Sequence, residues 1–457
     1  MGSLDIALFL ISAILFFGST VLTKDDIMHT DMIISLVVSL PILAVAYIFV
    51  PKNKYKSAYI LLVFLAGLIR MALVSYLYSN GTDTFGTDGL LYHQEGILVA
   101  RQLDEGVPFY SVKYSYTWYT VLVGILYYIF GINRYIVSYM NVIVTFFSAI
   151  LLLKMALNHH CKFVNAAFIS LAFLYFPNLI LWTSDSRKEA LIMFLCFLCW
   201  YHVQLICIDI VERKRSVFNN LVSILLVCFL IWLGTLIRIY IFVPLAFGII
   251  LSQLLLYKKN RSRLCIVFAA IAFVSSIIIF FVTVNPLMSD YHAITFHEAS
   301  SSSFMDTMNG RISTIGTIAS DRNILLSVIN YLLLPYPGNI HFGYVQSNNL
   351  LEVIVSLDIT AWYICLFLML PGIYSAIKQK ESSLIGILAF LASYVIINAL
   401  VVENVSDTIY RYRSVIIGLA LLFIDFDVLK KMFYRLRGYL GSKADTAARR
   451  TVNSYKH

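Results

Sequence analysis

Long apolar runs separated by short polar segments occupy most of the chain. The candidate membrane spans cover roughly residues 4–22, 32–50, 57–78, 117–131, 135–153, 163–182, 189–208, 217–236, 239–257, 263–284, 355–377, 383–401 and 409–427. Runs of about 20 apolar residues match the hydrocarbon thickness of a bilayer, and only helices or closed barrels satisfy their backbone there. These runs are too continuous for the alternating strands of a barrel. The pattern predicts an all-α polytopic transmembrane helical bundle of about 11–13 spans.

Composition agrees with this class. Apolar residues make up 60% of the 457 residues and charged residues only 13%, whereas soluble proteins carry about a quarter. We therefore expect one integral membrane domain over 1–457, without a separate soluble domain.

The net charge of +9 reports orientation rather than a nucleic-acid partner. Lys and Arg gather in short loops, for example at 52–56, 213–215 and 258–263, and in the tail 428–457. Such clustering follows the positive-inside rule and predicts that both termini are cytoplasmic. The lipid bilayer is then the expected partner. Abundant Ile, Asn, Lys and Ser favour the inner membrane of a bacterium.

This orientation puts four polar regions outside the cell, at 79–116, 183–189, 285–354 and 402–412. Three apolar segments lie between the first two regions, although an even number of crossings is required. One segment within 117–182 must therefore be re-entrant or lie in the interface, where protein or a wet cavity can surround it. The sequence leaves open which of the three it is.

The first external loop combines acids with a helical pattern. Glycines precede Asp88, and apolar residues from Leu90 onward predict an amphipathic helix whose start the Asp88 carboxylate would stabilise. Asp88, Tyr92 and Glu95 would share one face of that helix. The loop therefore indicates either a reaction site at the membrane face or a capped interfacial helix with solvated acids.

The second external corner follows an apolar run that we expect to bend at Pro177. The polar residues from Thr183 to Ser186 could cap the next helix, with Arg187 and Lys188 in its first turn. Cations in a first turn oppose the helix dipole. An anionic ligand, or an acid across a cavity, would explain them, and the alternative is a pair that extends to the lipid headgroups.

Further arginines lie within or near the ends of spans. Arg70 lies deep in the third run, and Arg238 interrupts LGTLIRIYIF, where we expect it near the outer surface. Ionisable residues inside a membrane are costly and therefore candidates for function. Arg411 and Arg413 flank Tyr412 before the last span. Guanidinium groups suit phosphate binding.

Three segments between residues 80 and 200 resemble the GT-C superfamily of polytopic glycosyltransferases, which includes aminoarabinose transferases, protein O-mannosyltransferases and oligosaccharyltransferases. The segments are TDGLLYHQEGILVARQL, YTWYTVLVGILYYIFGINRYIVSYMN and FPNLILWTSDSRKEALIMFL. The resemblance implies that Asp88 is the catalytic or metal-associated acid, that Asp185 or Glu189 is a second one, and that the donor is a sugar on a polyprenyl phosphate or diphosphate. The acidic loop follows the third span here, whereas it usually follows the first in that family.

These observations together predict a glycosyltransferase that works at the outer membrane face in cell-surface glycan assembly, on a glycan or lipid acceptor. One alternative is an O-antigen-type polysaccharide polymerase, which the RYR segment also suits, and another is a transporter of lipid-linked glycans. The expected catalytic residues are Asp88, Asp185 and Glu95, and Asp88 and Asp185 are also the expected ligands of a divalent metal ion. The expected phosphate-binding residues are Arg187, Lys188, Arg238, Arg311, Arg411 and Arg413.

Overall fold

The computed structural model describes residues 48–79, 87–114, 118–132, 134–159, 161–212, 217–284, 324–333, 349–401, 406–426 and 428–430. Within these ranges every element is an α-helix except one turn of 3₁₀ helix, Phe109–Ser111, and no strand occurs. This confirms the all-helical class.

Seven helical segments of the described residues are long and apolar enough to cross a membrane, or up to eight if a bent pair counts as one span. They lie in helices α3 (Lys56–Ser79), α6 (Arg134–Asn158), α9 (Glu189–Glu212), α10 (Val217–Asn260), α15 (Asn349–Gln379) and α16 (Ser382–Val401). Helix α10 contributes two of them, because its backbone leaves the helical region at Arg238 (φ −161°, ψ 91°). Two further expected spans, 4–22 and 32–50, lie outside the described residues, apart from residues 48–50.

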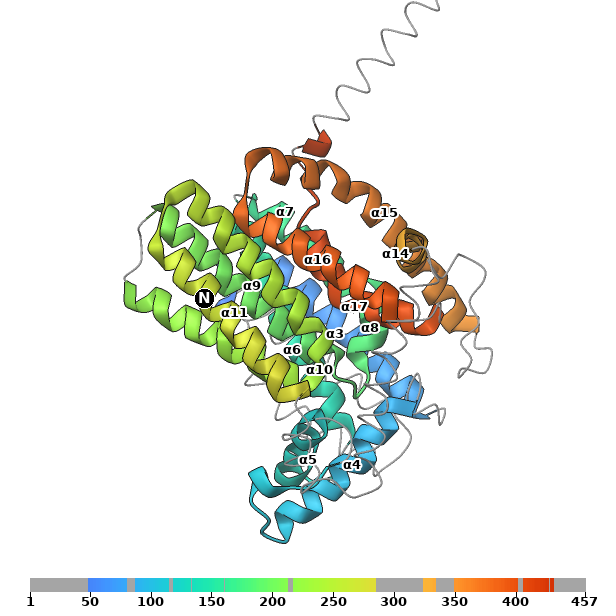
Figure 1. The fold of residues 1–457 in the computed structure, drawn as a ribbon. Helices are drawn as coiled ribbons and strands as arrows, with labels where there is room; N and C mark the ends of the chain where they lie inside the picture. The colour runs from blue at the N-terminus through green and yellow to red at the C-terminus, as the bar shows by residue number, and fades with distance from the viewer. Residues whose placement is uncertain are drawn as a thin grey trace, which may run out of the picture.

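The helices of the bundle approach one another closely where small residues meet. Helix α10 packs between α9, α11 (Arg263–Val284) and α16 (Figure 1). A Cβ atom on Gly248 of α10 would lie 2.6 Å from the carbonyl oxygen of Gly386 in α16. Small residues allow such close approach in membrane bundles, where dispersion rather than water drives packing.

A bend divides the helical segment that leads to the second polar corner. Helices α7 (Phe163–Tyr175) and α8 (Pro177–Ser184) meet at an angle of 58°. Proline starts a helix readily but cannot continue one, since it lacks the N–H and its ring clashes with the preceding turn. The bend expected at Pro177 is therefore confirmed.

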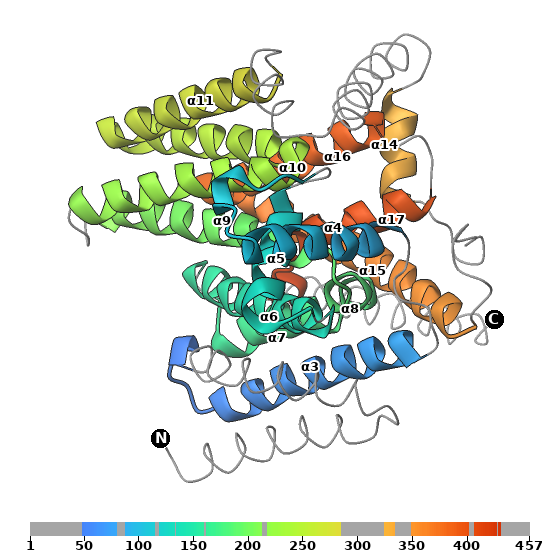
Figure 2. The same cartoon turned by 90° about the horizontal axis from the view of Figure 1, so that it is seen from below.

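Helices α4 (Thr87–Asp104) and α5 (Trp118–Phe130) pack against each other at one end of the bundle (Figures 1 and 2). Glycines bring them together, because a Cβ atom on Gly124 would lie 2.2 Å from a methyl carbon of Val99. His93 Nδ1 and the hydroxyl of Tyr127 form a hydrogen bond of 2.9 Å between the two helices.

Helix α5 differs from the span that was expected over the first of the three apolar segments in this region. The run at 117–131 was expected to be a span, but α5 has only 13 residues and is too short to be counted as one. Helix α6 passes the length and hydropathy test alone, and α7 and α8 pass it together. We therefore correct the assignment of 117–131 as a span: α5 is too short and packs with α4 beside the bundle end, while the bent pair of α7 and α8 is either a broken span or a re-entrant loop.

Candidate functional site

The second polar corner, residues 185–188, joins α8 to α9 at the bundle end that α4 and α5 cover. The Asp185 carboxylate accepts hydrogen bonds from the backbone N–H of Ser186 (2.7 Å) and from Nε of Arg187 (2.9 Å). Thr183 and Ser184 were expected to cap the next helix. Their hydroxyls instead donate to carbonyls four residues earlier, inside α8. Helix α9 begins only at Glu189.

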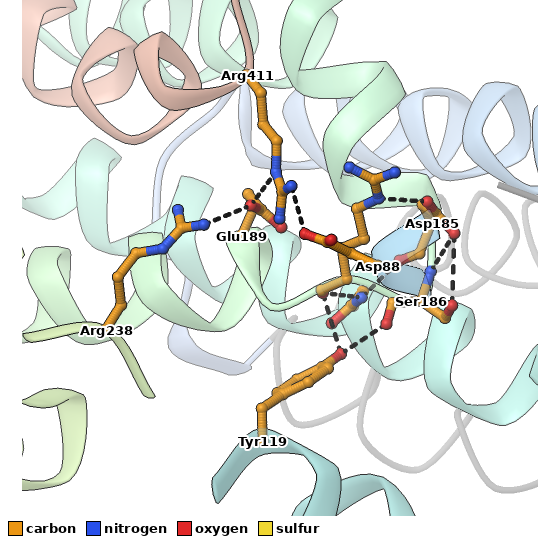
Figure 3. A network of polar contacts seen from close by, with 9 residues as sticks. Asp88, Tyr119, Asp185, Ser186, Glu189, Arg238 and Arg411 are labelled. Carbon is orange, nitrogen blue, oxygen red and sulfur yellow. Dashed lines mark hydrogen bonds and ion pairs between the residues drawn. The ribbon is translucent and has the colours of Figure 1, made fainter. Parts of the chain in front are cut away.

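Neighbouring helices hold the backbone of this corner from two sides (Figure 3). The Tyr119 hydroxyl of α5 donates to the carbonyls of Ser186 (3.2 Å) and Arg187 (3.0 Å). The Asn141 amide of α6 donates to the carbonyls of Asp185 (2.6 Å) and Arg187 (2.7 Å). Bonds of this kind replace the water that the buried carbonyls lose. They fix the direction in which the corner's side chains leave the backbone.

Glu189 is fully buried and receives two arginines from distant parts of the chain. Its Oε1 accepts a hydrogen bond from Nε of Arg411, 2.6 Å away, and lies 3.4 Å from Nη2 of Arg238 (Figure 3). Arg411 belongs to α17 (Ser406–Leu421), and Arg238 lies at the break in α10. An acid this deeply buried requires such partners, since desolvation is otherwise too costly.

Asp88 joins the same group through Arg411. It lies in the first turn of α4, as expected, and its Oδ2 is 2.5 Å from Nη1 of Arg411. One guanidinium therefore bridges an acid of the bundle, Glu189, and an acid of the 79–116 loop. The Asp88 side chain keeps 23% of its surface exposed, whereas that of Glu189 keeps none.

Lys188 completes this group. Its Nζ donates to the carbonyl of Ile237, 3.4 Å away, and lies 5.6 Å from the centre of the Tyr92 ring of α4. The charges of Arg238, Glu189, Arg411 and Asp88 all act on it. We call the five residues Asp88, Lys188, Glu189, Arg238 and Arg411 the ion cluster.

Burial and neighbouring charges shift the pKa values at this end of the bundle. Burial lowers the pKa of Lys188 most, and Arg238 lowers it further, so that it falls to about 7. Burial raises the pKa of Asp88, but Arg411 and then Arg187 outweigh it and hold the pKa below its ordinary value. Burial also raises the pKa of Asp185, and there it outweighs Arg187.

The RYR segment sends its three side chains in different directions. Arg411 reaches Glu189, while the ring of Tyr412 lies 4.7 Å below the guanidinium of Arg238. Arg413 donates to the carbonyl of Tyr331 (3.2 Å) in α14 (Ile324–Leu333). Residues two apart on a helix point about 200° apart. Arg411 and Arg413, which we expected to grip one ligand together, therefore face different surroundings.

The structure brings together most of the expected site residues. Asp88, Lys188, Arg238 and Arg411 form the ion cluster with Glu189, and the Asp185–Arg187 pair lies in the adjacent corner. Arg413 is held elsewhere, and Glu95 lies two turns along α4 from Asp88 and is not among the residues labelled in Figure 3. Arg311 lies outside the described residues.

The donor set at Asp88 and Asp185 does not fit the divalent metal ion that we expected there. Each carboxylate faces an arginine, Arg411 for Asp88 and Arg187 for Asp185. Among the described residues, no group of three or more His, Cys, Asp or Glu side chains comes together. Divalent ions of the Mg²⁺ type prefer several oxygen ligands. The metal site stays an untested prediction, and no step below uses it.

Several residues around the cluster were missed by the sequence reasoning. Tyr119 and Asn141 carry no pattern that sets them apart from other polar residues in apolar helices. Asp358 was also missed, although it is fully buried in the span Val355–Gln379. An acid inside an apolar run is a signal that could have found it.

Comparisons with protein-family models, with curated proteins and with solved structures gave no match to this chain. Its chemistry must therefore be argued from the ion cluster itself.

Proposed function

We propose that this protein is a membrane glycosyltransferase that takes a sugar from a polyprenyl phosphate carrier at the outer membrane face. One observation carries the proposal: four segments far apart in the chain deliver buried, hydrogen-bonded charges to one end of an apolar bundle. A purely structural network is the plain alternative. Burying ion pairs in place of apolar contacts adds little to stability, however, so such a network is weakly explained by folding alone.

The balance of charge in the ion cluster favours an anionic substrate. Its three cations, Lys188, Arg238 and Arg411, face two carboxylates, Asp88 and Glu189. The Nη2 atom of Arg411 is buried and makes no hydrogen bond with any residue of the described ranges. A phosphate oxygen is a suitable acceptor for such a guanidinium N–H.

The apolar surface beside the cluster suits a lipid-borne substrate. Leu90, Leu91 and Leu98 of α4 are 40%, 38% and 49% exposed, although this helix also carries Asp88. Exposed apolar groups next to a charged site are typical of a helix that lies at a membrane interface. The positive-inside pattern of the basic loops supports an outer location for this end.

In the proposed reaction, an acceptor hydroxyl attacks the anomeric carbon of the sugar. The new bond from the hydroxyl oxygen to this carbon forms while the bond from the carbon to the phosphate oxygen breaks. The electron pair stays with the phosphate, where Arg411, Arg238 and Lys188 stabilise its charge. Asp88 orients the hydroxyl by accepting its hydrogen bond and takes up its proton.

The test replaces Asp88 by Asn, which keeps the side chain's shape and removes its charge. In reconstituted vesicles supplied with undecaprenyl phosphate carrying a tritium-labelled hexose, we expect transfer to fall at least about 100-fold. Asp104→Asn is the matched control, because Asp104 lies in the same helix and is exposed. Wild-type transfer by the Asp88 variant, with unchanged insertion and thermal stability, would reject the proposal.

The two alternative functions predict different products. A polymerase would join repeat units into a ladder of lengths on a gel, and would depend on Arg413 as much as on Arg411. The geometry does not favour this, since Arg413 faces α14 and α15. A transporter would move the lipid carrier across the membrane without changing its glycan.

A further inference from the structure

Asp358 requires an explanation, because it is a fully buried acid in a membrane span and does not belong to the ion cluster. It lies in α15, which packs against α8 and α17. A carboxylate in the bilayer interior is expensive unless a specific role or partner compensates it. Its contacts therefore indicate what it does.

Asp358 caps the start of α8 from another helix. Its Oδ1 accepts a hydrogen bond of 2.7 Å from the backbone N–H of Asn178. The residue that precedes α8, Phe176, provides no side-chain cap of its own. Because the first N–H groups of a helix lack partners and its N-terminus is positively polarised, a carboxylate there stabilises both. The bend after α7 is thus held by an acid 180 residues further along the chain.

Asn178 in turn connects α8 to the backbone beside Arg411. Its side-chain amide donates to the carbonyl of Tyr410, 2.7 Å away. Trp182, near the other end of α8, has its ring 5.9 Å from the Arg411 guanidinium and 6.2 Å from the ring of Tyr410. Helix α8 therefore contacts both the backbone and the side chain of the segment that delivers Arg411.

Helix α15 holds α17 at a second point. The guanidinium of Arg413 lies 5.2 Å from the ring of Trp362, one turn after Asp358. Arg413 and Asp358 also act on each other electrostatically. The backbone on both sides of Arg411 is thus fixed, through Tyr410 before it and Arg413 after it.

We infer that Asp358 and Asn178 are positioning residues that hold the Arg411 guanidinium in register between Asp88 and Glu189. The effect of this positioning on catalysis rests on the proposed function. A guanidinium that must bridge two carboxylates and also meet a phosphate tolerates little displacement, because hydrogen bonds weaken steeply with geometry. Neither residue touches the substrate, and both act through Arg411.

The experiment compares Asn178→Ala with Asn220→Ala. Asn220 is also a buried asparagine, whose side-chain amide donates to the Asp209 carboxylate of α9, at the other end of the span Phe218–Arg238 from the ion cluster. With the undecaprenyl phosphate hexose donor, we expect Asn178→Ala to lower kcat about tenfold with a smaller change in KM. Asn220→Ala should leave both constants near their wild-type values. Equal losses in the two variants would overturn the inference.

Asp358 offers a second comparison that does not require Asn178→Ala to fold. Asp358→Asn keeps an oxygen that can accept the N–H of Asn178, whereas Asp358→Ala removes it. We expect the Asn variant to restore most of the kcat that the Ala variant loses. If the Ala and Asn variants have the same kcat, the capping bond does not position Arg411.

A thermal unfolding cycle separates this inference from the proposed function. Each asparagine variant is combined with Arg411→Gln, and the melting temperatures are compared. Coupled sites give effects that do not add, and distant sites give effects that do. Non-additive shifts for Asn178 and additive shifts for Asn220 support the positioning role even if the wild type transfers no sugar, which would reject only the proposed function. Additive shifts for both overturn the positioning role.

Discussion

Lys188 gives the sharpest prediction, because its charge should change near neutral pH. Its pKa is lowered to about 7, first by burial and then by Arg238. A phosphate bound in the ion cluster would favour the charged form and raise this pKa again. Phosphate binding should therefore take up a proton, and affinity should fall as the pH rises above 7.

The size of the effect follows from the fraction of Lys188 that carries a proton. With a pKa of about 7, about nine-tenths of the molecules are protonated at pH 6 and about 3% at pH 8.5. If only the protonated form binds well, apparent affinity follows this fraction. We expect binding to weaken by up to about 30-fold between these two pH values.

The pH dependence of folding stability has the opposite sign to the pH dependence of ligand binding. The unfolded chain holds the lysine proton up to the ordinary pKa of 10.5, whereas the folded chain releases it near pH 7. The unfolded state then binds more protons between these values, so the contribution of Lys188 to stability rises with pH in this window. As the pH rises, the melting temperature of the ligand-free protein should increase through this contribution of Lys188. The additional increase in melting temperature that the ligand causes should become smaller.

The assay measures binding of a polyprenyl methyl phosphate diester, whose single charge stays constant between about pH 6 and 9. Lys188→Arg keeps its charge throughout, because an arginine is not deprotonated in this range. The affinity of the Lys188→Arg variant for this ligand should therefore not vary with pH. Lys113→Arg, at an exposed position after α4, is the control and should behave like the wild type. A wild-type affinity that stays constant from pH 6 to 8.5 would refute the reasoning.

Two further substitutions test the bridge and the packing that presents it. Arg411→Lys removes the forked guanidinium that reaches Asp88 and Glu189 together. This change should reduce kcat/KM about 10- to 100-fold in the transfer assay. Unchanged kinetics would mean that a single point charge suffices. Gly124→Ala places a Cβ atom 2.2 Å from Val99 and should lower stability by about 1–3 kcal/mol in thermal unfolding. Adding Val99→Ala should recover much of that loss, and a double variant no more stable than Gly124→Ala would contradict the packing argument.

The sequence predicts the parts of the site that follow local rules. The helix after Asp88, the bend at Pro177 and the polar corner at 185–188 follow from capping, proline chemistry and the cost of charges beside apolar runs. Helix geometry alone would also have separated Arg411 from Arg413, since positions two apart cannot point the same way.

The remaining features depend on tertiary contacts that no local pattern encodes. Helix α5 has the apolar composition of a membrane span. Its short length and its packing against α4 distinguish it from the spans of the bundle. Asn178 resembles any polar residue after a proline, until the structure brings Asp358 and Tyr410 to it from distant parts of the chain. Hydrogen bonds over such separations cannot be read from a single sequence.

The order in which the ion cluster's members are synthesised has a consequence for biogenesis. Glu189 emerges from the ribosome before Arg238, and Arg411 comes only with the last helix of the described bundle. Until α17 packs into the bundle, Glu189 therefore lacks one of its two arginines and Asp88 lacks the guanidinium that pairs with it. Closure of the bundle and completion of the ion cluster are then the same late event, so a chain truncated before α17 would leave the Asp88 and Glu189 carboxylates without the Arg411 guanidinium that bridges them.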